Sequence, residues 1–84
     1  MKTTINGKRW TIQDSAIYGL CEPAESLISI DPRLGQHHRM EIMVHELLHA
    51  LDGDLTEAEV AEQSCVIAEA LWRDGYRRRV KKRG

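Results

Sequence analysis

Residues 40–51 of the chain read MEIMVHELLHAL. Apolar side chains recur there at positions 40, 43, 44, 47, 48 and 51, which is the spacing of one face of an α-helix. Gly35 and Gln36 lie near the start of this pattern, and Asp52-Gly53 interrupts it. The segment therefore predicts an amphipathic helix that begins near residue 36 and stops at residues 52–53.

A second helix is expected directly downstream. Thr56 is followed three residues later by Glu59, which is a capping-box pattern typical of a helix start. Asp74-Gly75 is predicted to end this helix. Its inward face is expected to carry Val60, Ala61, Ser64, Ile67, Ala68, Leu71 and Trp72.

The residues before these helices favour β-structure. Residues 3–5 and 9–12 flank Asn6-Gly7, a pair that tolerates positive φ and indicates a tight hairpin. Residues 15–20 are expected to form a third strand, and residues 27–30, which read LISI, a fourth. We therefore predict an α+β fold, in which a small N-terminal antiparallel sheet is followed by two helices.

Length and composition limit the class of protein. The 84 residues predict a single domain over residues 1–76 and a basic C-terminal tail over residues 77–84. Hydrophobic residues make up 42% and charged residues 30%, as in globular proteins. We recognise no signal peptide and no apolar run of about 18 residues, so we expect a cytoplasmic protein with no membrane partner. Cys21 and Cys65 form no CxxC pair and are expected to be reduced residues in or near the core.

Three polar residues interrupt the apolar pattern of the first helix. His45 and His49 are four residues apart, which places them about 40° apart around the axis and one turn apart along it. Two imidazoles at this spacing can bind one Zn²⁺. Glu46 directly follows the first of them and can take a proton from a water on the metal. Together they form the HExxH pattern, which indicates two zinc ligands and a general base.

A catalytic zinc usually has a third protein ligand. Helical phase favours Glu57, because it lies on the same stripe of the second helix as Val60 and Ser64. Gly53 allows the chain reversal that would pack the second helix against the first. Asp54 and Glu62 remain the alternatives for the third ligand.

Residues 40–51 are similar to the active-site helix of zincin metallopeptidases. More narrowly, residues 19–77, about two thirds of the chain, resemble small phage- and prophage-encoded metallopeptidases of the minimal zincin (minigluzincin-like) kind. The matching pieces are the HELLHA run, the sequence LTEAEV at residues 55–60 and the sequence ALWRDGYR at residues 70–77. The chain differs from metzincins, because Leu55 stands where their third histidine would be.

The resemblance implies Zn²⁺, Glu46 as general base, a peptide or protein substrate, and Glu57 as third ligand. A phage-encoded protein of this kind would work in the host cytoplasm. The architecture also implies an edge strand ahead of the active helix, for which residues 27–30 are the candidate, that pairs with an extended substrate.

A few other residues are secondary candidates. His37 and His38 precede the motif and are expected to form a polar helix start, although they could bind a second metal or an oxyanion. Tyr18 and Tyr76 are candidates for donating a hydrogen bond to a tetrahedral intermediate, as zincins often need. Each is interpreted first as an ordinary amphipathic residue.

We therefore predict a zinc metallopeptidase-like hydrolase with Glu46 as general base and His45, His49 and Glu57 as metal ligands. The first alternative is a non-catalytic, zinc-stabilised binding module. The second is a small nucleic-acid-binding protein that uses the basic residues between Arg77 and Arg83. The oligomeric state is not predicted.

Overall fold

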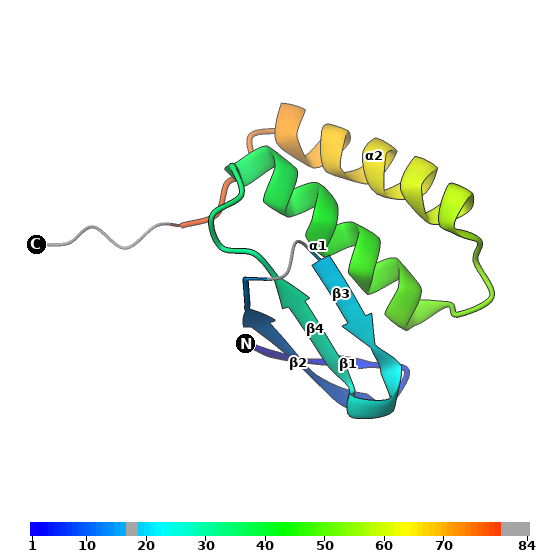
Figure 1. Cartoon of the computed structure of the whole chain (residues 1–84). Helices are drawn as coiled ribbons and strands as arrows, with labels where there is room; N and C mark the ends of the chain where they lie inside the picture. Colours follow the sequence, from blue (N-terminus) through cyan, green and yellow to red (C-terminus); the bar gives the residue numbers. More distant parts are fainter. Residues whose placement is uncertain (17–18, 80–84) are drawn as a thin grey trace, which may run out of the picture.

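A computed structural model describes residues 1–16 and 19–79 of the chain (Figure 1). These residues form four strands, β1 (Lys2–Ile5), β2 (Lys8–Asp14), β3 (Gly19–Glu22) and β4 (Leu27–Ile30), followed by helices α1 (Gln36–Leu51) and α2 (Glu57–Arg73). A short 3-10 turn (Pro23–Glu25) joins β3 to β4. The predicted α+β class is confirmed. Neither helix is long enough and apolar enough to cross a membrane.

Local sequence signals account for the ends of most elements. Asn6 and Gly7 both have positive φ, 51° and 78°, and turn the chain between β1 and β2 as the hairpin signal predicts. The backbone N–H of Asp52 bonds back to the carbonyl of Leu48 where α1 ends. Helix α2 begins with the predicted capping box: the Thr56 side chain accepts from the Glu59 N–H, and the Glu59 carboxylate accepts from the Thr56 N–H.

The sheet differs from the prediction in the direction of one strand pair. The strands lie in the order β1-β2-β4-β3, and β2 pairs with β4 in parallel. The sheet is therefore mixed, and the prediction of a wholly antiparallel sheet was wrong. The reason is that β3 and β4 form an antiparallel pair of their own, which docks on β2 through β4. The third strand also begins later in the sequence than the predicted strand over residues 15–20. Ser15 and Ala16 are not in a strand, residues 17–18 lie outside the described part, and β3 starts at Gly19.

One face of this sheet forms the core. Ile28 and Ile30 alternate along β4 and are fully buried, and Ile12 and Trp10 of β2 and Ile5 of β1 complete the buried cluster. Helix α1 covers this face with the half-buried side chains of Ile42, Met43, Leu47 and Ala50. Helix α2 lies on the far side of α1 (Figure 1), so α1 is the middle layer between the sheet and α2.

Helix α2 buries a narrower stripe than predicted. Val60, Ser64 and Ala68 are buried, whereas Ala61 and Ile67 are exposed. The physical reason is that α2 packs mainly against one neighbour, α1, so only the residues along the line of that contact are buried. Glu57 stands three residues before Val60 and therefore lies at the start of the buried stripe.

Candidate metal centre

His45 and His49 of α1 lie close to Glu57, the first residue of α2, where the buried stripe of α2 begins. His49 Nε2 lies 2.8 Å from Glu57 Oε1, and His45 Nε2 lies 3.3 Å from Glu57 Oε2. The two Nε2 atoms are 3.2 Å apart. These three side chains are of the types that bind metals, and their donor atoms all lie within 4.8 Å of one another. They are such a group among the described residues.

The spacing of these donor atoms fits a zinc ion. Ligand atoms at about 2.0–2.1 Å from a tetrahedral Zn²⁺ lie about 3.3 Å from each other. The three observed separations, 2.8, 3.2 and 3.3 Å, are close to this value. Both imidazoles are about four-fifths buried, while Glu57 is 77% exposed. The group is therefore anchored on α1 and open to solvent on the side of Glu57.

The turn between the helices determines where Glu57 lies. Asp52 Oδ1 accepts a hydrogen bond from the Asp54 N–H at 3.0 Å, and the Asp52 carbonyl accepts from the Leu55 N–H at 3.3 Å. Thr56 then caps α2, which leaves Glu57 as the first helical residue, facing α1. Because this turn is short and hydrogen-bonded, the Glu57 carboxylate is held near both histidines.

The two other candidates for a third ligand lie elsewhere. Asp54 is exposed within the turn and is not part of the ligand group. Glu62 lines a shallow hollow on α2 together with Val66 and Ile67. Of the three candidates, Glu57 is therefore the one that the structure brings to the histidines.

Glu46 is the buried residue of α1. It is 6% exposed, and its Oε2 is buried without a hydrogen-bond partner among the described residues. Burial raises the pKa of the Glu46 carboxyl; the positive charges that His45 and His49 can carry oppose this shift, and the charge on Glu57 adds to it. A carboxylate with one free oxygen and a raised pKa can exchange a proton with a group that enters the site.

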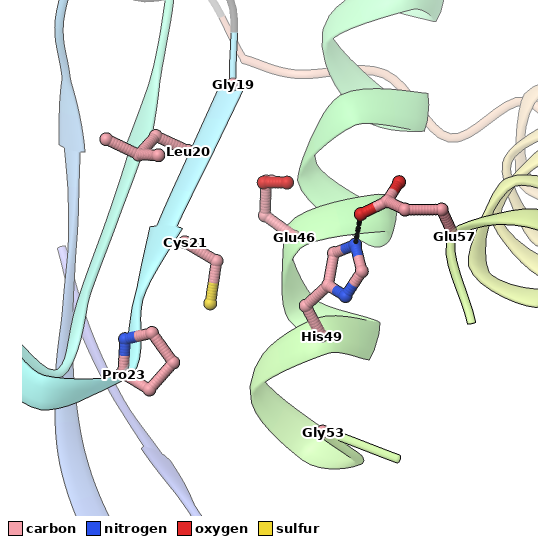
Figure 2. A pocket seen from close by; sticks show the side chains of 8 residues that line it. All are labelled: Gly19, Leu20, Cys21, Pro23, Glu46, His49, Gly53 and Glu57. Carbon is pink, nitrogen blue, oxygen red and sulfur yellow. Dashed lines mark ion pairs between the residues drawn. The ribbon is translucent and has the colours of Figure 1, made fainter. Parts of the chain in front are cut away.

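A cavity of about 390 Å³ lies between β3 and this cluster (Figure 2). One wall is formed by Gly19, Leu20, Cys21 and Pro23, and the other by Glu46, His49, Gly53 and Glu57. Strand β3 is at the edge of the sheet, whereas β4 lies between β2 and β3. The expectation that residues 27–30 form the edge strand was therefore wrong, and the strand at the site is β3.

Sequence reasoning missed Gly19, which sets how closely β3 approaches α1. A Cβ at this position would lie 2.6 Å from Ile42 Cγ2 and 3.8 Å from the Glu46 side chain. No side chain larger than hydrogen fits there without displacing Ile42. The signal that could have found it is an isolated glycine inside a strand, which often marks a close backbone approach.

We expect Gly19→Ala to destabilise the fold by about 1–3 kcal/mol, because the added methyl overpacks the contact with Ile42. Urea unfolding followed by circular dichroism measures this change. In an Ile42→Ala background the clashing Cγ2 is gone, so the same substitution should cost much less. Equal costs in both backgrounds would show that Ile42 does not limit the approach of β3.

Cys21 places a thiol in the same cavity. Its side chain is half-buried, and burial raises the pKa of the thiol, with the charge on Glu46 as a second cause. The group therefore stays protonated at neutral pH. Cys65 lies exposed on α2, so the prediction that both cysteines are in or near the core was wrong for Cys65.

The secondary candidates that the structure describes, His37, His38 and Tyr76, are not part of this site. His37 stacks on Trp72, with ring centroids 4.6 Å apart, and its Nε2 lies 3.4 Å from a Glu69 oxygen. His37 and His38 are in the first turn of α1, about 10–12 Å along the axis from His45. Tyr76 follows the far end of α2. Tyr18 lies outside the described residues.

Comparison with known proteins adds no relative. No protein-family model matches the chain, and no match was found among curated proteins or solved structures. The observations above therefore define a candidate His-His-Glu metal-binding group on an α+β fold.

Proposed function

We propose that this protein is a zinc-dependent hydrolase of peptide bonds, with His45, His49 and Glu57 as metal ligands and Glu46 as general base. The observation that carries the proposal is the position of Glu46. A buried carboxylate, one oxygen of which has no hydrogen-bond partner among the described residues, lies in the same cavity as His49 and Glu57. A purely structural metal site has no need for such a group, because an unpaired buried carboxylate destabilises the fold.

The chemistry divides between the metal and the protein. A Zn²⁺ held by the three side chains would polarise a carbonyl and lower the pKa of water at its open position. Glu46 accepts a proton from a water in the cavity as the oxygen of that water bonds to the carbonyl carbon, and then donates the proton to the leaving amine as the C–N bond breaks. The raised pKa of the Glu46 carboxyl brings it closer to neutral pH, which suits a group that both takes and returns a proton.

The edge of the sheet supports a peptide as the substrate. Strand β3 pairs with β4 on one side, and no other strand of the described chain pairs with its second side. An edge strand can add an extended peptide through backbone hydrogen bonds. A peptide on β3 would run along the cavity wall that faces Glu46 and His49.

Zinc-dependent hydrolysis of an unfolded protein substrate tests this function. The purified protein is stripped with a chelator, assayed with fluorescently labelled casein, and assayed again after addition of one equivalent of Zn²⁺. We expect turnover only in the zinc-loaded protein. Stoichiometric zinc binding without hydrolysis of casein or of a mixed peptide library would instead favour the non-catalytic, zinc-stabilised module.

A further inference from the structure

A second hollow region lies near the other end of α1, away from the metal centre. Two cavities of about 390 and 300 Å³ share three lining residues, Arg39, Met43 and Arg78. Arg39 is in the first turns of α1, about 9 Å along the axis from His45. The region is therefore separate from the cluster of His45, His49 and Glu57.

Specific contacts hold Arg78 at this place. After α2 the chain turns at Gly75, whose φ is 93°, and runs back toward the start of α1. The Arg77 guanidinium lies 3.3 Å from the centroid of the Trp72 ring and donates to the carbonyl of Trp72 at 2.8 Å. The Arg78 N–H donates to Gln36 Oε1 at 3.2 Å. The first residues of the basic tail are thus docked on the helices.

The region carries more positive than negative charge. The Arg39 side chain is only 14% exposed, and its Nε is buried without a hydrogen-bond partner among the described residues. The carboxylate that meets it is that of Asp14, 3.6 Å from Arg39 Nη2 and half exposed. Burial and the nearby charge of Arg78 both lower the pKa of Arg39, while Asp14 raises it. The first turn of α1 adds no acidic residue. An anion placed between the two arginines would relieve their repulsion.

We propose that Arg39 and Arg78 bind a backbone phosphate of single-stranded nucleic acid. Tyr76 supports a nucleic acid over a free anion, because it is 58% exposed and lines the same cavity as both arginines. Its ring offers a platform on which a base can stack next to the bound phosphate. Arg79 follows directly in the sequence and adds a further cation, which favours a polyanion over a single anion.

Fluorescence anisotropy with a short labelled oligothymidine and the full-length protein tests this site. We expect Arg78→Ala to weaken binding roughly tenfold and to reduce the slope of log K against log salt by about 0.7, the value for one phosphate contact on a single strand. Tyr76→Ala should weaken binding about tenfold while leaving the salt slope unchanged, since stacking releases no counterion. Thermal melting of each variant shows that it is folded.

Arg73→Ala is the matched control. Arg73 also carries one charge near the end of α2, but it is exposed and pairs with Glu69 at 2.7 Å, so its removal should change affinity less than twofold. Equal losses in Arg73→Ala and Arg78→Ala would overturn the proposal, because binding would then follow net charge alone. Full loss of binding on replacing Lys81, Lys82 and Arg83 by alanine, with no loss in Arg78→Ala, would overturn the proposal, because binding would then depend on residues 81–83 and not on Arg78. Equal affinity for a poly-glutamate peptide and for oligothymidine would overturn the proposal that the ligand is a nucleic acid. None of these measurements depends on zinc or on hydrolysis.

Discussion

Glu46→Gln is expected to reduce hydrolysis roughly 10²- to 10⁴-fold, the range that a lost general base typically costs. Glutamine has nearly the same shape as glutamate, so the packing between β3 and α1 should be preserved. What is lost is the ability to accept a proton, because an amide does not gain one at neutral pH. The turnover number measured with saturating substrate reports this loss directly.

Two further measurements separate this effect from a structural one. Zinc content should remain at one equivalent in Glu46→Gln, because Glu46 is not among the three proposed ligands. The melting temperature should not fall, because the substitution removes a buried charge, one oxygen of which lacks a partner in the described part of the chain. Glu62→Gln, on the outer side of α2, is the matched control and should retain full turnover. Turnover in Glu46→Gln close to that of the control would exclude Glu46 as the base.

The helices and the cluster of His45, His49 and Glu57 were predictable because their signals are local. The apolar period of residues 40–51 and the capping box at Thr56 depend on residues within one or two turns, and both elements form as expected. Glu57 could be selected for the same reason: its phase relative to Val60 is set by α2 itself. A ligand group on two consecutive helices joined by a short turn needs no long-range information.

The sheet order and the second wall of the cavity were not predictable in the same way. Whether β4 pairs with β2 or lies at the edge depends on contacts between residues far apart in sequence, such as Ile12 beside Ile28. The hydrophobic alternation of a strand determines which of its faces is buried, but it does not determine which strand lies next to it. For the same reason the approach of Gly19 to Ile42, and that of Arg78 to Gln36, emerged only from the structure.

Zinc is expected to raise the melting temperature of the protein by roughly 10–20 °C when it is present at about a hundred times its dissociation constant. Binding to the folded state alone contributes about 2.7 kcal/mol at that excess, and each kcal/mol shifts the melting temperature of a domain this size by about 4–8 °C. The structural reason for a large response is that α2 packs mainly on α1 through a narrow stripe, and the metal would link the two helices. Differential scanning fluorimetry with and without chelator measures the shift.

Glu57→Ala should remove most of this shift, because the metal would then be held by α1 alone and would no longer join the helices. His45→Ala should remove it too, whereas Glu62→Ala and Asp54→Ala should melt like the wild type with and without zinc. In the absence of metal, Glu57→Ala should cost little, since the carboxylate is 77% exposed and its pairs with the imidazoles are largely solvated. A zinc response that survives in Glu57→Ala and is lost in Asp54→Ala would move the third ligand into the turn. A response lost in neither variant would mean that the two histidines alone hold the ion.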